Sequence, residues 1–323
     1  MYVSARRSWF SLLFVSGRSV LPHIWGRAIG TTLIALALTI AHQLTGFFHG
    51  FSLTPVPFTM IGVPLGIFLG FRNNTSYDRF WEGRRMWGGL VNTSRSLGRQ
   101  ILTLVEQAAL YTPEGDVDGA SRPAPEITLF QRAMVHRVAA FAHALRLHLR
   151  GQPIDELVRL LPEAEVEALR AERNVPTAIV FTMGRELQAA WHRGWIHPQH
   201  LPVLDASLTE LTNIQGACER IKNTPIPFSY TVLIHRIVAF YCFLLPLGLV
   251  DSIRWLSPVV VLFVSYVLFG LDAIGDEVED PFGTDVNDLP LTALSTTIEI
   301  NLRQRLGETD LPAAPQPVDG VLS

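Results

Sequence analysis

Four long runs of apolar residues constrain this chain more than any other feature. They cover residues 28–48, 57–71, 227–250 and 257–271. Backbone polar groups in a bilayer must be bonded internally, so such runs form either helices or closed barrels. The alternation of apolar and polar residues that marks a strand is not found, which favours helices. With 48% hydrophobic and only 17% charged residues, the chain is predicted to be an all-α membrane protein with four spans.

Arginines set the expected topology. They precede the first span at Arg6, Arg7, Arg18 and Arg27, and follow the second at Arg72, Arg79, Arg84 and Arg85. The link between these two spans has no Lys or Arg. By the positive-inside rule both flanks are cytoplasmic, and so are both termini of a four-span chain. The aromatic and basic residues before residue 28 indicate an amphipathic segment on the inner membrane surface.

Five regions are predicted. Residues 1–77 hold the amphipathic segment and two membrane helices, 78–225 a cytoplasmic helical block, and 226–275 the last two membrane helices. A cytoplasmic belt follows over 276–306, and the Pro-rich, polar residues 307–323 are expected to be mobile. Within the block, residues 112–125 read as a loop, and Pro162 is expected to mark a helix start.

Two stripes at helical spacing run along the second apolar segment. Small residues form one, at Gly62, Gly66 and Gly70, and bulky residues form the other, at Val63, Ile67 and Phe71. Positions four apart share one face of a helix. The glycine stripe is expected to let another helix approach closely. The bulky stripe has two interpretations, ordinary helix packing or the lining of a pore. Pro64 lies between the stripes and either kinks the helix or is merely tolerated there.

Several functions are not indicated. A net charge of −3 gives no reason to expect a nucleic-acid partner. Nucleophile elbows, phosphate-binding loops and paired general acids and bases are not found, so no enzyme is predicted. The ten histidines do not have the spacing of a known zinc motif. Both cysteines, Cys218 and Cys242, read as reduced structural thiols.

Three long motifs resemble the bestrophin family in its bacterial form. They are IFLGFRNNTSYDRFWEGRRMWG at residues 67–88, CERIKNTPIPFSYTVLIHR at 218–236 and DEVEDPFGTDVNDLPL at 276–291. The resemblance implies a homopentamer in the bacterial inner membrane, whose second membrane helices line a central pore for small monovalent ions. It implies a chloride channel, with cation permeation as an open possibility. The alternative class is a membrane scaffold or regulator whose helical block binds a partner.

The resemblance also implies roles for individual residues. The family's hydrophobic neck falls on Val63, Ile67 and Phe71, and its second, cytoplasmic constriction falls near His200. Five copies of a histidine at a narrow exit would titrate near neutral pH. Such an uncharged neck closes by dewetting and steric contact, and does not select ions by fixed charge.

Charged residues next to the spans have alternative roles. Arg72 directly follows the neck, and is either an anchor at the membrane boundary or part of a ring that faces the vestibule. Arg236 lies in the third span, where an ionisable group is costly, and is expected to pair with Asp272 or Asp276.

The acidic run at 276–291 corresponds to the calcium clasp of animal bestrophins. Asp285 and Asp288 match two of its carboxylates, but Thr284 replaces a third. Calcium prefers six to eight oxygen ligands, so the missing carboxylate puts calcium activation in doubt. The alternative for this run is a structural belt around the pentamer. No other cofactor is indicated.

Overall fold

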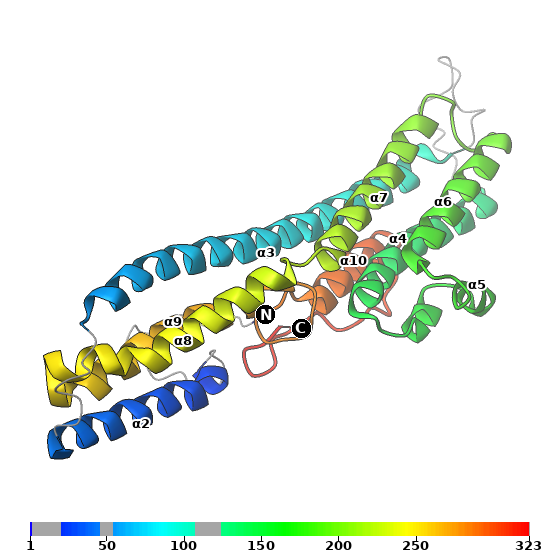
Figure 1. Cartoon of the computed structure of the whole chain (residues 1–323). Coiled ribbons are helices and arrows are strands. Elements are labelled where there is room, and N and C mark those ends of the chain that lie inside the picture. The colour runs from blue at the N-terminus through cyan, green and yellow to red at the C-terminus, as the bar shows by residue number, and fades with distance from the viewer. Residues whose placement is uncertain (2–20, 46–53, 107–123, 323) are drawn as a thin grey trace. The chain divides into compact units, whose positions relative to one another are not determined.

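The computed structural model describes Met1 and residues 21–45, 54–106 and 124–322. The expected N-terminal amphipathic segment, and nearly all of the expected loop at 112–125, lie outside these ranges. The described residues form helices, with isolated β-bridges but no strand (Figure 1). The all-α prediction is therefore confirmed. The α-helices are α2 (Leu21–Thr45), α3 (Val56–Leu104), α4 (Pro125–Arg150), α5 (Glu163–Leu169), α6 (Val175–His192), α7 (Leu201–Asn223), α8 (Phe228–Ile253), α9 (Ser257–Glu279) and α10 (Leu291–Arg305).

The chain forms two compact units. One contains α2, the first part of α3, α8 and α9, and its boundaries fall after Trp81 and Pro281 and before Thr224. The other contains Glu82–Asn223 and Phe282–Ser323. We refer to them as the membrane unit and the cytoplasmic unit.

Apolar side chains from all four helices form the core of the membrane unit. One cluster includes Ile24 of α2, Leu65 of α3, Val238 of α8 and Phe269 of α9. These residues are at most 3% exposed. Burying a large aliphatic or aromatic side chain stabilises a fold by about 1.5–3 kcal/mol relative to water. In a bilayer, where lipid replaces water, close packing supplies most of the attraction between helices.

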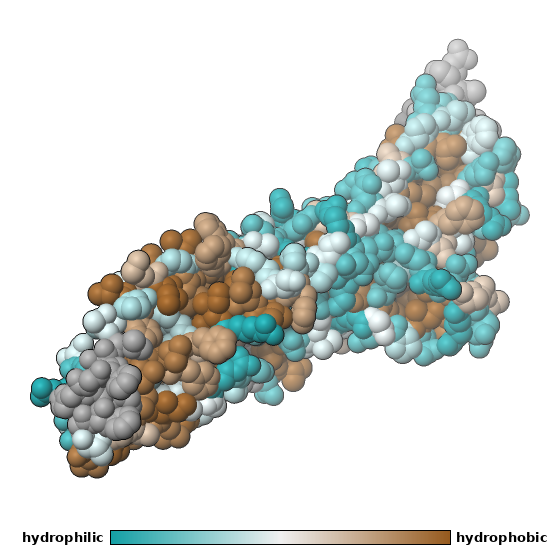
Figure 2. Space-filling view, viewed as in Figure 1, coloured by the Kyte–Doolittle hydropathy of each residue, from teal (hydrophilic) through white to brown (hydrophobic). Residues whose placement is uncertain are grey.

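The membrane unit has the length and hydropathy that spanning requires. Three stretches qualify, at Pro22–Thr45, Val56–Leu104 and Phe228–Glu279, and the last contains both α8 and α9. Hydrophobic residues dominate the visible surface over these helices (Figure 2). The chain is therefore a membrane protein, as predicted. The fourth span is longer than expected, because α9 continues past residue 271 through the first acidic residues to Glu279.

Helix α3 runs without a break from the membrane unit into the cytoplasmic unit. It has 49 residues, with Pro64 inside it, and is about 74 Å long at 1.5 Å per residue. The expected boundary at residues 77–78 therefore falls inside one continuous helix. Beyond that point α3 buries a different set of side chains, which are Trp87, Leu90, Leu97 and Ile101.

Helix α4 lies at the centre of the cytoplasmic unit. It packs against α6, α7 and α10, and every residue from Val138 to Leu147 is buried. Four of those ten residues are alanines, which let neighbouring helices approach closely. One buried polar pair joins two helices of this core: Nε2 of His143 on α4 lies 2.9 Å from Oε2 of Glu299 on α10. As expected, a helix begins after Pro162, which precedes α5.

The C-terminal segment, for which composition predicts mobility, makes specific contacts at its start. Residues 307–322 follow a defined, irregular path. The start of this segment is held by Glu308. The Glu308 carboxylate accepts hydrogen bonds from Arg303 (2.6 Å) and Arg132 (3.0 Å), and it lies 2.8 Å from Nε2 of His136. These ion pairs fix the polar chain although it buries little apolar surface.

Candidate functional site

The bulky stripe of α3 faces away from the rest of the chain. Val63, Ile67 and Phe71 are 60%, 53% and 61% exposed. On the opposite side of the helix, Leu65 and Leu69 are at most 3% exposed and belong to the core. Packing within one chain therefore uses the leucine face and leaves the bulky stripe open.

The glycine stripe splits between two environments. A Cβ atom on Gly62 would lie 2.7 Å from the Tyr241 hydroxyl of α8, so this position requires glycine unless the tyrosine moves. A Cβ atom on Gly66 or Gly70 would meet no described atom within 4 Å. Close approach within the chain therefore explains only the first of the three glycines.

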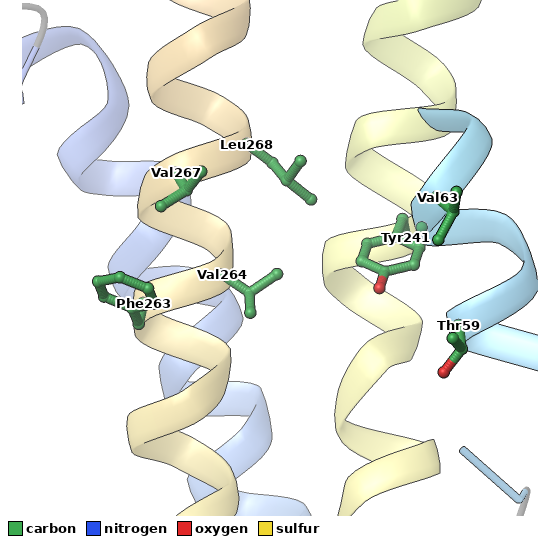
Figure 3. Close-up of a pocket in the computed structure, with 8 residues that line it drawn as sticks. Thr59, Val63, Tyr241, Phe263, Val264, Val267 and Leu268 are labelled. Carbon is green, nitrogen blue, oxygen red and sulfur yellow. The ribbon is translucent and has the colours of Figure 1, made fainter. Parts of the chain in front are cut away.

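An open apolar groove of about 420 Å³ lies next to the stripe, between α3, α8 and α9. In Figure 3, Val264 and Leu268 extend from α9 toward α8, and Tyr241 lies beside Val63 of α3. The polar groups in its lining are the hydroxyls of Tyr241 and Thr59, so the groove has no charged residue with which to bind an ion or catalyse a reaction.

A charged cluster, which we call the Arg72 cluster, lies one residue beyond the stripe inside the membrane unit. The Arg72 guanidinium is fully buried. Its Nη1 donates to Oδ1 of Asp272 at 2.6 Å, and its Nη2 donates to Asp276. His235 of α8 completes the cluster. Its Nδ1 lies 3.2 Å from Oδ1 of Asp272, and its Nε2 lies 3.2 Å from Oδ2 of Asp276.

This cluster corrects two expectations. Arg72 is neither an anchor at the membrane boundary nor a vestibule charge, because its side chain is buried and ion-paired. The basic partners of Asp272 and Asp276 are Arg72 and His235, whereas Arg236 is exposed and makes no ion pair with a described residue. Adjacent positions on a helix point about 100° apart, so only one of the pair 235–236 can face α9. The sequence does not show which of the two faces inward.

The Arg72 cluster is not suited to a metal ion. Among the described residues, His235, Asp272 and Asp276 are the one group whose potential ligand atoms lie within 4.8 Å of one another. The Arg72 guanidinium already donates to both carboxylates, and a metal ion would place a second cation against it. Arginine cannot lose its proton to make room.

Asp285 and Asp288 lie together in the turn that follows α9. Asp288 is 3% exposed, and its Oδ2 accepts a hydrogen bond of 2.7 Å from the Asp285 backbone N–H. The Asp285 side chain is exposed. One carboxylate therefore stabilises the turn, and the two aspartates supply at most part of the oxygen shell that calcium needs.

His200 lies directly before α7, in the cytoplasmic unit. Its side chain is half-buried, and its ring centroid is 5.5 Å from that of His197. The two rings are tilted against each other, which is an ordinary aromatic contact.

These features define a class: a helical membrane protein that presents an uncharged, exposed stripe on one spanning helix. Comparison with known proteins identifies the family. The model of the "Bacterial/Fungal Bestrophin protein" family matches residues 1–304. The chain is 38% identical to a "voltage-dependent anion channel-forming protein" of Ralstonia nicotianae, over 96% of both chains. It is 35% identical to a protein of the same description from Escherichia coli K12, over 97% of this chain and 96% of the relative.

Solved structures agree with this assignment. A bacterial bestrophin homologue from Klebsiella pneumoniae superposes with a TM-score of 0.79 at 34% identity, covering 88% of this chain and 99% of the other. The chain belongs to the bestrophin family. The resemblance carried by the three sequence motifs is thereby confirmed.

Proposed function

We propose that the chain forms a homopentameric ion channel in a bacterial inner membrane, with both termini in the cytoplasm. Five copies of α3 surround its pore, and Val63, Ile67 and Phe71 form the neck. The observation that carries this proposal is the exposed stripe itself. The spanning window of α3 is 17% buried in the chain, against 28% for α2 and 39% for α8–α9. A helix that the rest of its own chain covers so little is suited to contact with other copies.

The glycines support the same arrangement. Gly66 and Gly70 have open space beside them in the single chain, so their lack of side chains allows neighbouring copies of α3 to approach. Close approach of the copies brings the three bulky side chains to the axis. The neck carries no charge, and it controls the passage of ions through its width and wetting.

The permeant ion is proposed to be a small monovalent anion, and the names of the relatives describe those proteins as anion channel-forming. A second candidate, cation permeation, is favoured by one observation. The positive charge on α3 nearest to the neck, on Arg72, is buried against Asp272 and Asp276, so no exposed arginine lies on the described part of α3 between Phe71 and Asp78. Reversal potentials in a tenfold NaCl gradient distinguish the two. An ideally selective pore gives about 59 mV, and the sign identifies the ion.

The neck is tested by replacing Val63, Ile67 and Phe71 together with alanine. The wider pore is expected to raise single-channel conductance in a planar bilayer several-fold. The matched control is Val259, Phe263 and Val267 of α9, another exposed apolar stripe at the same spacing. Their replacement by alanine should leave conductance unchanged. Equal conductance of the neck variant and the wild type would refute the neck assignment.

Assembly is tested separately, by the mass of the protein in detergent and by ion flux into liposomes. A pentamer that conducts agrees with the channel. A monomer without flux would contradict it, and would favour a membrane scaffold whose helical block binds a partner.

A further inference from the structure

The face of α3 that carries the neck continues beyond Phe71 and becomes polar. Asn74 follows Ile67 by seven residues, and Asp78 follows Phe71 by seven. Seven residues are nearly two helical turns, so Asp78 lies about 20° round the axis from Phe71 and about 10.5 Å further along it. Both polar side chains are exposed, as the neck side chains are.

The nearby positive charges on α3 turn away from this face. Arg72 is the one charged residue between Phe71 and Asp78 in the sequence, and it is buried in the Arg72 cluster. Arg79 turns toward α9, where its Nε donates to the Glu279 carbonyl at 3.1 Å. The first charge on the neck face that is not compensated within the chain is therefore negative.

Asp78 itself has no partner among the residues that the structure describes. Its exposed carboxylate makes no hydrogen bond or ion pair with them. The other acid near this part of α3, Glu82, is paired with Arg220 at 2.7 Å. Because no local cation in the described part of the chain neutralises the Asp78 carboxylate, its negative charge acts directly on ions in the adjacent solvent.

We propose that Asp78 is a charge-selectivity residue of the ion path, which raises the local concentration of cations and lowers that of anions below the neck. The inference rests on the proposed pentamer, in which five copies of this carboxylate form a ring. The inference predicts only that Asp78 shifts the selectivity toward cations. It therefore holds whether the wild-type channel prefers anions or cations. Arg85, seven residues further along α3 and also exposed, acts with the opposite sign from a more distant level.

The size of the effect follows from screened electrostatics. Five like charges that surround a narrow path, with a screening length of about 8 Å in physiological salt, change the sodium-to-chloride permeability ratio by about tenfold or more. Asp78→Asn is therefore expected to lower that ratio by this factor, measured from reversal potentials in a tenfold NaCl gradient. The matched control is Glu163→Gln, which removes an exposed acid from α5 and should leave the ratio unchanged.

A second experiment remains informative even if the asparagine variant assembles poorly. Asp78→Cys is treated with thiol reagents of either charge during recording. The native thiols, Cys218 and Cys242, are fully buried and should not react. A negatively charged adduct should raise the sodium-to-chloride ratio, and a positively charged adduct should lower it.

The outcomes separate this inference from the channel itself. A conducting wild type whose permeability ratio is unchanged by Asp78→Asn overturns the selectivity role and leaves the channel proposal intact. The same holds if the Asp78→Cys channel does not respond to the sign of the reagent. A wild type that does not conduct contradicts the proposed function instead.

Discussion

Removing Arg72 tests whether the Arg72 cluster holds the membrane unit together. Arg72→Met keeps most of the volume of the side chain but leaves Asp272 buried, at 3% side-chain exposure, without its closest cation. Asp276 is 44% exposed and loses less, because solvent can replace the guanidinium. Removing one partner of a buried ion pair costs about 3–5 kcal/mol. For a chain of this length, that lowers the melting temperature by on the order of 10 °C.

The measurement is thermal unfolding in detergent, followed by size-exclusion chromatography. Arg85→Met, at an exposed arginine of the same helix, is the control and should cost less than about 0.5 kcal/mol. The double variant Arg72→Met with Asp272→Leu removes both charges and should recover most of the loss, since apolar replacements of buried pairs are often neutral. If Arg72→Met lowers the free energy of unfolding by less than about 1 kcal/mol, the pair contributes no more than a surface ion pair. That result would refute the role of the Arg72 cluster in holding the membrane unit together.

Two further predictions concern the cytoplasmic unit. Burial acts to raise the pKa of Glu308, but hydrogen bonds from Arg303 and His136 lower it to about 2 from an ordinary 4.5. Its folded-state pKa is depressed, so Glu308 stabilises the fold above about pH 4.5 and this contribution is lost as the pH falls toward 2. The melting temperature of Glu308→Gln should be below that of the wild type at neutral pH and converge with it in acid; a constant difference contradicts the ion-pair role. At the proposed second constriction, His200→Ala should widen the path and raise single-channel conductance, and an unchanged conductance would remove His200 from the ion path.

Local spacing was enough to predict much of this fold. The apolar runs indicated the spans, and the interval of four residues alone separated Val63, Ile67 and Phe71 from the glycines. The first signal depends on hydropathy and length, and the second on helix geometry, and both can be read locally without knowing the partners of a residue. The change in polarity after Phe71 was interpreted as a boundary, although the helix itself continues to Leu104.

Long-range pairing could not be predicted in this way. Arg72 and Asp272 are 200 residues apart, and nothing near Arg72 in the sequence shows that it is buried. The choice between His235 and Arg236 depends on the rotation of α8, which the packing of the whole membrane unit sets. The contacts of Glu308 with Arg132 of α4 and Arg303 of α10 are likewise long-range or depend on the path of the chain, and composition alone does not show them.

The continuity of α3 has a mechanical consequence. Residues of one unbroken helix keep fixed angles to one another, so a rotation of α3 that moves the buried face of Leu65 and Leu69 also turns the exposed face that carries Phe71. Bending is easiest where a backbone hydrogen bond is missing, and Pro64 lacks the N–H that would donate to the Met60 carbonyl one turn earlier. The easiest bend in α3 therefore lies at the start of the exposed stripe, where it would tilt Val63 relative to Ile67 and Phe71.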